Sequence, residues 1–143
     1  KGGSMRVSRF LLMAGAALVA VGMTAGLSAQ SKTDEDYDKL MKGVGAANGA
    51  MRKATEPDAI GAEAKKLQAL FKDANQFWMG RSNKEAADWA TTAMNQAAAI
   101  EKAAVAKNTE GIAASLKELG GSCQACHAKY REKTETGFAI KKS

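Results

Sequence analysis

The residues with the most distinctive chemistry lie together near the C-terminus, in the sequence CQACH. Cys123 and Cys126 are the only two cysteines of the 143-residue chain, and His127 is its only histidine. Thiol and imidazole side chains serve zinc binding, thiol–disulfide chemistry and the attachment of haem. The function of this cluster is therefore the first question that the sequence poses.

Zinc and a redox dithiol both match the cluster poorly. A structural zinc site usually takes four Cys or His ligands, whereas this chain supplies three, so a carboxylate or water would have to complete the site. A thioredoxin-like pair normally begins a helix in a βαβ unit, where the helix N-terminus lowers the pKa of a thiol. Here the pair falls near the end of a long predicted helix, so both alternatives are disfavoured.

Covalent haem matches the cluster better, because Cys-x-x-Cys-His is the attachment signature of c-type cytochromes. Residues three or four positions apart share one face of a helix. Cys123 and Cys126 can thus form thioether bonds to the two vinyl groups on one edge of the porphyrin, while His127 turns inward to ligate iron. The spacing predicts one covalently bound haem c with its iron.

The elements that must position this cluster are predicted to be helices. The chain is rich in Ala, Lys, Glu and Met, and no run of alternating β-branched residues indicates a strand. Apolar spacing and breakers predict four helices: about 33–54, from 56 or 57 to 80, from after 82 or 83 to at least 104, and from about 109 to 130. The last ten residues are predicted to be a short tail. Short connections favour antiparallel neighbours, so the predicted fold class is all-α, an up-down-up-down four-helix bundle with covalently bound haem.

The composition of these helices bears on the ligand between them. Their apolar faces are dominated by alanine, so a large flat ligand would supply missing apolar volume. Trp78 and Trp89 either pack against such a ligand or are ordinary core residues. Gly120 and Gly121 precede the cysteines within a predicted helix, where each costs about 1 kcal/mol relative to alanine. They either give clearance to a macrocycle or a neighbouring helix, or they break the helix locally.

The N-terminal segment has the pattern of a secretory signal peptide. A positive start precedes the apolar run FLLMAGAALVAV and a stretch of small residues, with cleavage predicted after Ala29. We interpret 1–4 as a tag remnant or upstream residues, 1–29 as the signal peptide, and 30–143 as a single periplasmic domain. The alternative is a retained membrane anchor, although the apolar run is shorter than the ~20 residues that a bilayer span needs.

The charge of the exported chain argues against nucleic acid as a partner. Residues 30–143 contain 18 basic and 15 acidic side chains, a net charge of +3, and no basic run is present. Four cations would surround the cysteine-bearing helix: Lys117, Lys129, Arg131 and Lys133. They could steer an acidic redox partner, or they could be a solvated face.

A four-helix bundle that ends in CxxCHxxYR resembles the class II cytochromes c, the cytochrome c-prime family, and is most similar to its low-spin, methionine-ligated members. The resemblance covers 30–143 and rests chiefly on CQACHAKYREK. It implies that Cys123 and Cys126 carry the thioether bonds and that His127 is the proximal ligand. It also implies that Arg131 lies beside the proximal face, that Tyr130 packs the bundle there, and that two copies pair as a homodimer through their first two helices.

The sixth iron ligand decides which function the resemblance implies. In the low-spin members a methionine of the first helix fills this position, and Met41 in DKLMKGVG matches it. Met51 lies about 15 Å further along the helix and cannot face the same iron. From the residues alone, Met41 could instead be an ordinary core residue.

Two haem functions follow from these alternatives. With His127 and Met41 as axial ligands, the protein would carry single electrons and would not be an enzyme. With His127 alone, the haem would be five-coordinate and would bind nitric oxide or carbon monoxide. The contacts to the haem propionates stay open, because Tyr37 stands where many members have an arginine; the candidates are Lys39, Lys42 and Arg52.

Overall fold

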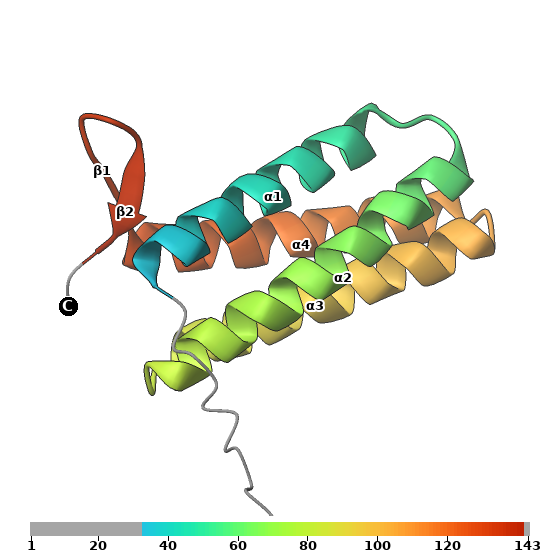
Figure 1. The fold of residues 1–143 in the computed structure, drawn as a ribbon. Coiled ribbons are helices and arrows are strands. Elements are labelled where there is room, and N and C mark those ends of the chain that lie inside the picture. The colour runs from blue at the N-terminus through green and yellow to red at the C-terminus, as the bar shows by residue number, and fades with distance from the viewer. Residues whose placement is uncertain (1–32, 142–143) are drawn as a thin grey trace, which may run out of the picture.

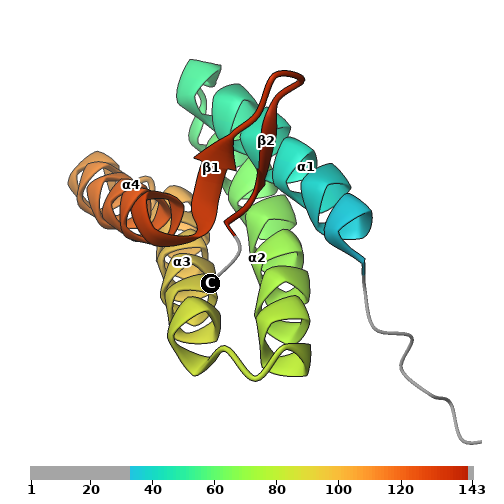
Figure 2. The same cartoon turned by 90° about the vertical axis from the view of Figure 1, so that its left-hand side faces the viewer.

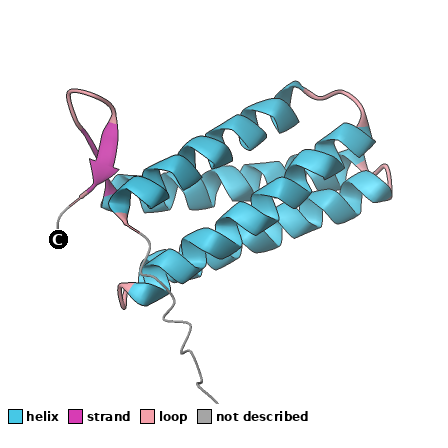
Figure 3. Cartoon of the chain, in the orientation of Figure 1, coloured by secondary structure: helices cyan, strands magenta, loops and turns pink. Residues whose placement is uncertain are grey.

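The protein is mostly helical over the residues that the structure describes (Figures 1 and 3). The computed structural model describes residues 33–141, so the predicted signal peptide and its cleavage site lie outside the described residues. In chain order the elements are α1 (Asp34–Lys53), α2 (Pro57–Gly80), α3 (Lys84–Val105), α4 (Thr109–Tyr130), β1 (Arg131–Lys133) and β2 (Phe138–Ile140). Within the described range, no helix combines the length and the apolar character that a membrane span requires.

Local sequence signals begin the helices where the sequence predicts them. At the start of α1, the Thr33 hydroxyl accepts a hydrogen bond from the Asp36 N–H (3.1 Å), and the Asp36 carboxylate accepts one from the Thr33 N–H (2.9 Å). Pro57 occupies the first turn of α2, where its missing N–H is not needed. The side chains of Asn83 and Asn108 cap α3 and α4 by accepting from backbone N–H groups of the first turn. The four predicted helices are thus confirmed.

Consecutive helices run antiparallel and pack one against the next (Figure 1). α1 packs against α2, α2 against α3 and α3 against α4, whereas α1 and α4 make little direct contact. Figure 2 shows α1 and α4 standing apart on either side of the C-terminal hairpin. The described fold is therefore a four-helix bundle in which one of the four sides is open.

The core between the helices is built largely from small side chains. Its largest fully buried residues are Met51, Leu67, Ile100 and Leu119, and alanine is the commonest of the other buried residues. All four belong to the main apolar cluster, which draws on every helix. Because an alanine buries little apolar area, these few large side chains contribute much of the core's stability.

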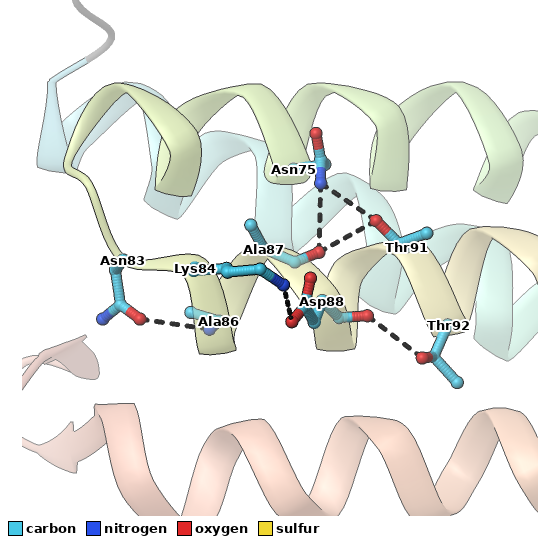
Figure 4. A network of polar contacts seen from close by, with 8 residues as sticks. All are labelled: Asn75, Asn83, Lys84, Ala86, Ala87, Asp88, Thr91 and Thr92. Carbon is cyan, nitrogen blue, oxygen red and sulfur yellow. Dashed lines mark hydrogen bonds and ion pairs between the residues drawn. The ribbon is translucent and has the colours of Figure 1, made fainter.

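Polar contacts fix the position of α2 along α3 (Figure 4). The side-chain amide of Asn75 on α2 donates to the Ala87 carbonyl and to the Thr91 hydroxyl of α3, each at 3.0 Å. The Thr91 hydroxyl in turn donates to the Ala87 carbonyl (3.0 Å). Since these groups are part-buried between the helices, sliding α2 along α3 would leave them unsatisfied.

The C-terminal segment forms a β-hairpin, so the prediction of a short tail without strands is wrong. β1 and β2 pair antiparallel, with Arg131 opposite Ile140. The Thr134 N–H donates to the Gly137 carbonyl (2.9 Å) and closes the turn, where Gly137 has a φ of 153°. A two-stranded hairpin is marginal alone. It is stabilised here because Ile140 packs against an apolar cluster of α2 and α3.

α4 passes through its two glycines without interruption. The helix extends from Thr109 to Tyr130, so a local helix break at Gly120 and Gly121 is ruled out. A methyl group at Gly121 would meet no neighbouring atom, and one at Gly120 would come only within 3.8 Å of the Arg52 guanidinium. At these two glycines the helix surface therefore carries no side chain and has almost no neighbouring atom close to it.

Replacing Leu67 with alanine tests the core. Leu67 is fully buried in the main apolar cluster, so Leu67→Ala should lower the free energy of unfolding by about 2–5 kcal/mol through lost burial and the cavity left behind. Urea unfolding followed by helical circular dichroism measures the change. The matched control is Val105→Ala, because Val105 is 79% exposed; its effect should stay within about 0.5 kcal/mol. Equal effects of the two substitutions would contradict this core.

Candidate functional site

A cavity of about 680 Å³ lies on the open side of the bundle, between α1 and α4. Its volume falls within the range of about 300–1,000 Å³ that is typical of sites for small molecules and cofactors. Residues of all four helices and of the hairpin line it. The cavity thus occupies the space that direct packing of α1 on α4 would have filled.

The α4 wall of the cavity carries the cluster that the sequence singled out. Cys123, Cys126, His127 and Tyr130 all line the cavity, because steps of three and four residues place them on one face of the helix. Both cysteines are half-buried and neither forms a disulfide. The structure therefore brings two free thiols and one imidazole to a single cavity.

The α1 wall of the same cavity carries Met41. Met41 is half-buried and, within residues 33–141, is the one methionine that lines the cavity. Met51 is 1% exposed in the main core and does not reach the site. Of the two methionines considered from the sequence, only Met41 shares a cavity with Cys123, Cys126 and His127.

The floor of the cavity, formed by α2 and α3, is apolar and aromatic. Phe71 and Trp78 of α2 and Trp89 of α3 line it together with several alanines of α3. Trp78 is buried and Trp89 is half-buried. Walls that are mostly apolar, with polar or ligating groups at a few points, are the usual construction of a cofactor site.

Tyr37 joins α1 to this floor. Its ring stacks on Phe77 with the centroids 4.2 Å apart, and its hydroxyl accepts a hydrogen bond from the Trp78 Nε1–H (3.0 Å). Burial raises the pKa of Tyr37 to about 12, so the phenol stays protonated at neutral pH. The Tyr130 ring lies 5.2 Å from Trp78 and 5.9 Å from Trp89, measured between centroids. Aromatic contacts therefore connect all four helices around the cavity.

The end of α4 is tied to the start of α3 by polar contacts. The Tyr130 hydroxyl lies within hydrogen-bond distance of a Glu85 carboxylate oxygen (3.0 Å) and of the Asn83 side-chain oxygen (3.2 Å). Lys129 forms an ion pair with Glu85. Hydrogen bonds from Lys129 and Tyr130 hold the pKa of the Glu85 carboxyl below its usual range. Of the four cations predicted to surround the cysteine-bearing helix, Lys129 is thus the one that forms an ion pair within residues 33–141.

Burial makes both thiols weak acids. It raises the pKa of Cys126 to about 11 and raises the pKa of Cys123 as well. A redox dithiol requires the opposite, because the thiolate is the nucleophile. The environment of the cysteines is therefore unfavourable to a thiol enzyme. Zinc gains no support either, since no three His, Cys, Asp or Glu side chains of residues 33–141 gather in a group that could hold a metal.

Burial shifts the pKa of His127 in the direction that favours metal ligation. It lowers the pKa of His127, and the positive charge of Arg131, one turn further on, acts in the same direction. The imidazole is therefore neutral at neutral pH, which is the form that binds a metal. Arg131 also lines the cavity, with its guanidinium 4.0 Å from the centre of the Phe138 ring.

The three residues considered for binding the haem propionates differ in whether they line the cavity. Lys42 lines the cavity and forms an ion pair with Asp38 (2.6 Å), which lines it too. Lys39 and Arg52 do not line it. Of the three lysine and arginine residues considered from the sequence, only Lys42 is therefore placed to meet a carboxylate there.

Reasoning from the sequence missed the hairpin as part of the site. Thr134, Phe138 and Ile140 all line the cavity. The available signal was a glycine-containing turn, TETG, followed by the alternation Phe-Ala-Ile, a pattern that favours a hairpin. The strands are so short that their stability depends on packing against the helices, which the sequence does not reveal.

Comparison with known proteins finds no match for this chain among protein-family models, curated proteins or solved structures. The site is therefore interpreted from its own residues and geometry.

A titration of the two tyrosines tests the contact between α1 and the floor. In the haem-free folded chain, the Tyr37 phenol should ionise near pH 12 because it is buried, whereas an exposed phenol ionises near ~10. Since the folded chain keeps this proton after the unfolded chain has lost it, stability should fall as the pH rises between these two values. Phenolate absorption measures the titration.

The step near pH 12 should vanish in Tyr37→Phe and persist in Tyr130→Phe, which serves as the matched control because the chain has only these two tyrosines. If the Tyr37 phenol of the wild-type chain ionised near ~10, as an exposed phenol does, its buried position would be refuted.

Proposed function

We propose that this chain is an exported c-type cytochrome that carries single electrons through one covalently attached haem, with His127 and Met41 as axial ligands. One observation carries the proposal: the only two cysteines of the chain, its only histidine and Met41 line one cavity. These are the side chains that attach a c-type haem and ligate its iron. The donor set and the apolar walls of the cavity both fit such a group.

Cys123 and Cys126 would attach the haem. The haem would supply two vinyl groups, and each thiol would add its S–H bond across one of them, sulfur going to the inner carbon and hydrogen to the terminal carbon. The addition uses no oxidant and releases no leaving group. Because the two thiols lie about one helical turn apart on one face of α4, they suit two groups on the same edge of a flat ring. Two covalent bonds would retain the haem in a cavity that the helices do not close.

His127 and Met41 would fill the two axial positions from different helices. Burial keeps the His127 imidazole neutral, so a ring nitrogen is free to ligate. Met41 offers a neutral thioether, a ligand that raises the reduction potential. When bound, the haem would supply an iron that alternates between the ferrous and ferric states. With both positions held by the chain, no substrate is turned over and the protein is a carrier rather than an enzyme.

The apolar floor would tune the potential further. Phe71, Trp78 and Trp89 give this side of the cavity an apolar surface. A positive charge is less stable where water is excluded, so such walls favour the ferrous state. The hydrogen bond from Trp78 to Tyr37 holds this part of the site in place, which limits structural change when an electron arrives or leaves.

Export and a protein partner complete the proposal. The segment 1–29 would direct the chain to the periplasm, and membrane association would follow only if that segment were retained. Lys117, Arg131 and Lys133 form no ion pair with another residue of 33–141 and would attract an acidic redox partner. A homodimer through α1 and α2 is a further expectation of the family resemblance.

A second candidate function is a five-coordinate haem protein that binds nitric oxide or carbon monoxide. The observation that favours it is the packing of Met41 against the main apolar cluster, as expected of a core residue. In that arrangement the Met41 thioether would line the cavity without ligating the iron. A diatomic ligand would then take the free axial position.

The absorption spectrum of the protein produced with haem attachment tests the proposal. We expect a Soret band and a low-spin ferric spectrum. Met41→Leu keeps the side-chain volume but removes the sulfur, so it should convert the ferric haem to high spin and let carbon monoxide bind the ferrous form readily. The matched control is Met51→Leu, which changes the buried methionine outside the cavity and should leave the spectrum unchanged.

Two other spectra would contradict the electron-carrier proposal. A wild-type protein that is already high-spin and binds carbon monoxide readily would favour the five-coordinate candidate. A protein without a Soret band would refute both haem functions. Replacing both cysteines with alanine should leave any haem removable under denaturing conditions, whereas the wild-type protein should retain it.

A further inference from the structure

The C-terminal hairpin presents an apolar side chain to the cavity that the described chain leaves largely uncovered. Phe138 lines the cavity, yet 54% of its surface is exposed. The Arg131 guanidinium lies over the ring, 4.0 Å from its centre. An exposed phenylalanine at the rim of an apolar cavity is a surface that a ligand in that cavity could cover.

The hairpin is attached to the bundle at three places. Ile140 packs against the apolar cluster around Phe77 and Trp78. The Lys141 N–H donates to the Tyr130 carbonyl (2.9 Å), which holds the end of β2 to the end of α4. β2 also contacts α1. The hairpin therefore spans from α4 to α1 at the end of the bundle where α1 begins and α4 ends (Figures 1 and 2).

The strand register directs both apolar side chains of β2 to one face. Phe138 and Ile140 are two residues apart, so they share a face of the hairpin. Their cross-strand partners on that face are Lys133 and Arg131. Because Ile140 packs on the helices, Phe138 lies on the same side, toward the bundle. Glu132 and its cross-strand partner Ala139 alternate to the other face; of these two, the small Ala139 still lines the cavity, whereas Glu132 does not.

We propose that this hairpin is the end wall of the haem site: Phe138 and Ile140 cover the bound ring at the end of the cavity where α1 begins and α4 ends, and keep water from it there. The identity of the ring rests on the proposed function, whereas the closure of the cavity does not. The consequence for the carrier is direct. With the wall removed, water reaches the ring, the ferric state is stabilised, and the reduction potential falls.

Two variants and one control test the wall. Phe138→Ala and Ile140→Ala each remove an apolar side chain from the cavity face of β2. Glu132→Ala is the matched control, because it shortens a side chain of the same hairpin that does not line the cavity. Phe138→Ala is the decisive variant, since its largely exposed side chain contributes little to folding; circular dichroism checks that each variant keeps its helices.

The first measurement needs no haem. In the full chain before haem attachment, iodoacetamide should alkylate Cys123 and Cys126 several-fold faster in Phe138→Ala and Ile140→Ala than in the wild type, because the reagent enters through the opened wall. Glu132→Ala should react at the wild-type rate. The second measurement is the midpoint potential of the haem-loaded protein, which should fall in the two cavity-face variants and not in the control.

The results separate the two proposals. Alkylation of folded Phe138→Ala at the wild-type rate, or an unchanged midpoint potential in that variant, would overturn the hairpin as a wall of the haem site. If the chain took up no haem at all, the proposed function would fail, and faster alkylation would still establish that the hairpin closes the cavity.

Discussion

The structure depends on the separation of two helices, α1 and α4, which do not pack against each other. α1 packs on α2 and α4 packs on α3, but α1 and α4 make little contact with each other. A bundle of four amphipathic helices normally closes this interface to bury apolar area. Here the two helices instead line a cavity of about 680 Å³. Cys123, Cys126, His127 and Met41 all line this one space, so the incomplete core and the candidate site are the same feature.

The rest of the fold keeps this side open. Asn75 and Thr91 lock α2 to α3, and these two central helices provide a floor on which both outer helices rest. The hydrogen bond from Trp78 to Tyr37 fixes the start of α1, while Tyr130 and Lys129 fix the end of α4 against Glu85. Because each outer helix has its own attachment, the bundle does not need contact between α1 and α4 in order to hold its shape.

The chemistry of the cavity favours the proposed haem over a redox dithiol and over zinc. Its thiols are weak acids, its imidazole is neutral, and its walls are aromatic and apolar. A redox dithiol would need an acidic thiol, and a zinc site would need a fourth ligand. A covalently bound haem requires neither, and it would supply the apolar volume that an alanine-rich core lacks. The proposal therefore accounts for the residues and for the open packing with one ligand.

The sequence by itself determined the helices and the spacing of the cysteine–histidine cluster. Both are local: caps such as Thr33 and Asn83 act within one turn, and a step of three or four residues gives one helical face regardless of the surroundings. The sequence also favoured Met41 over Met51, but only the tertiary structure placed Met41 in one cavity with His127. It alone decided that Tyr37 bonds to Trp78 and that the last residues form a hairpin at the end of the cavity. These outcomes rest on contacts between residues far apart in the chain. Periodicity shows which face of a helix or strand is apolar, but it does not show which distant segment will cover that face.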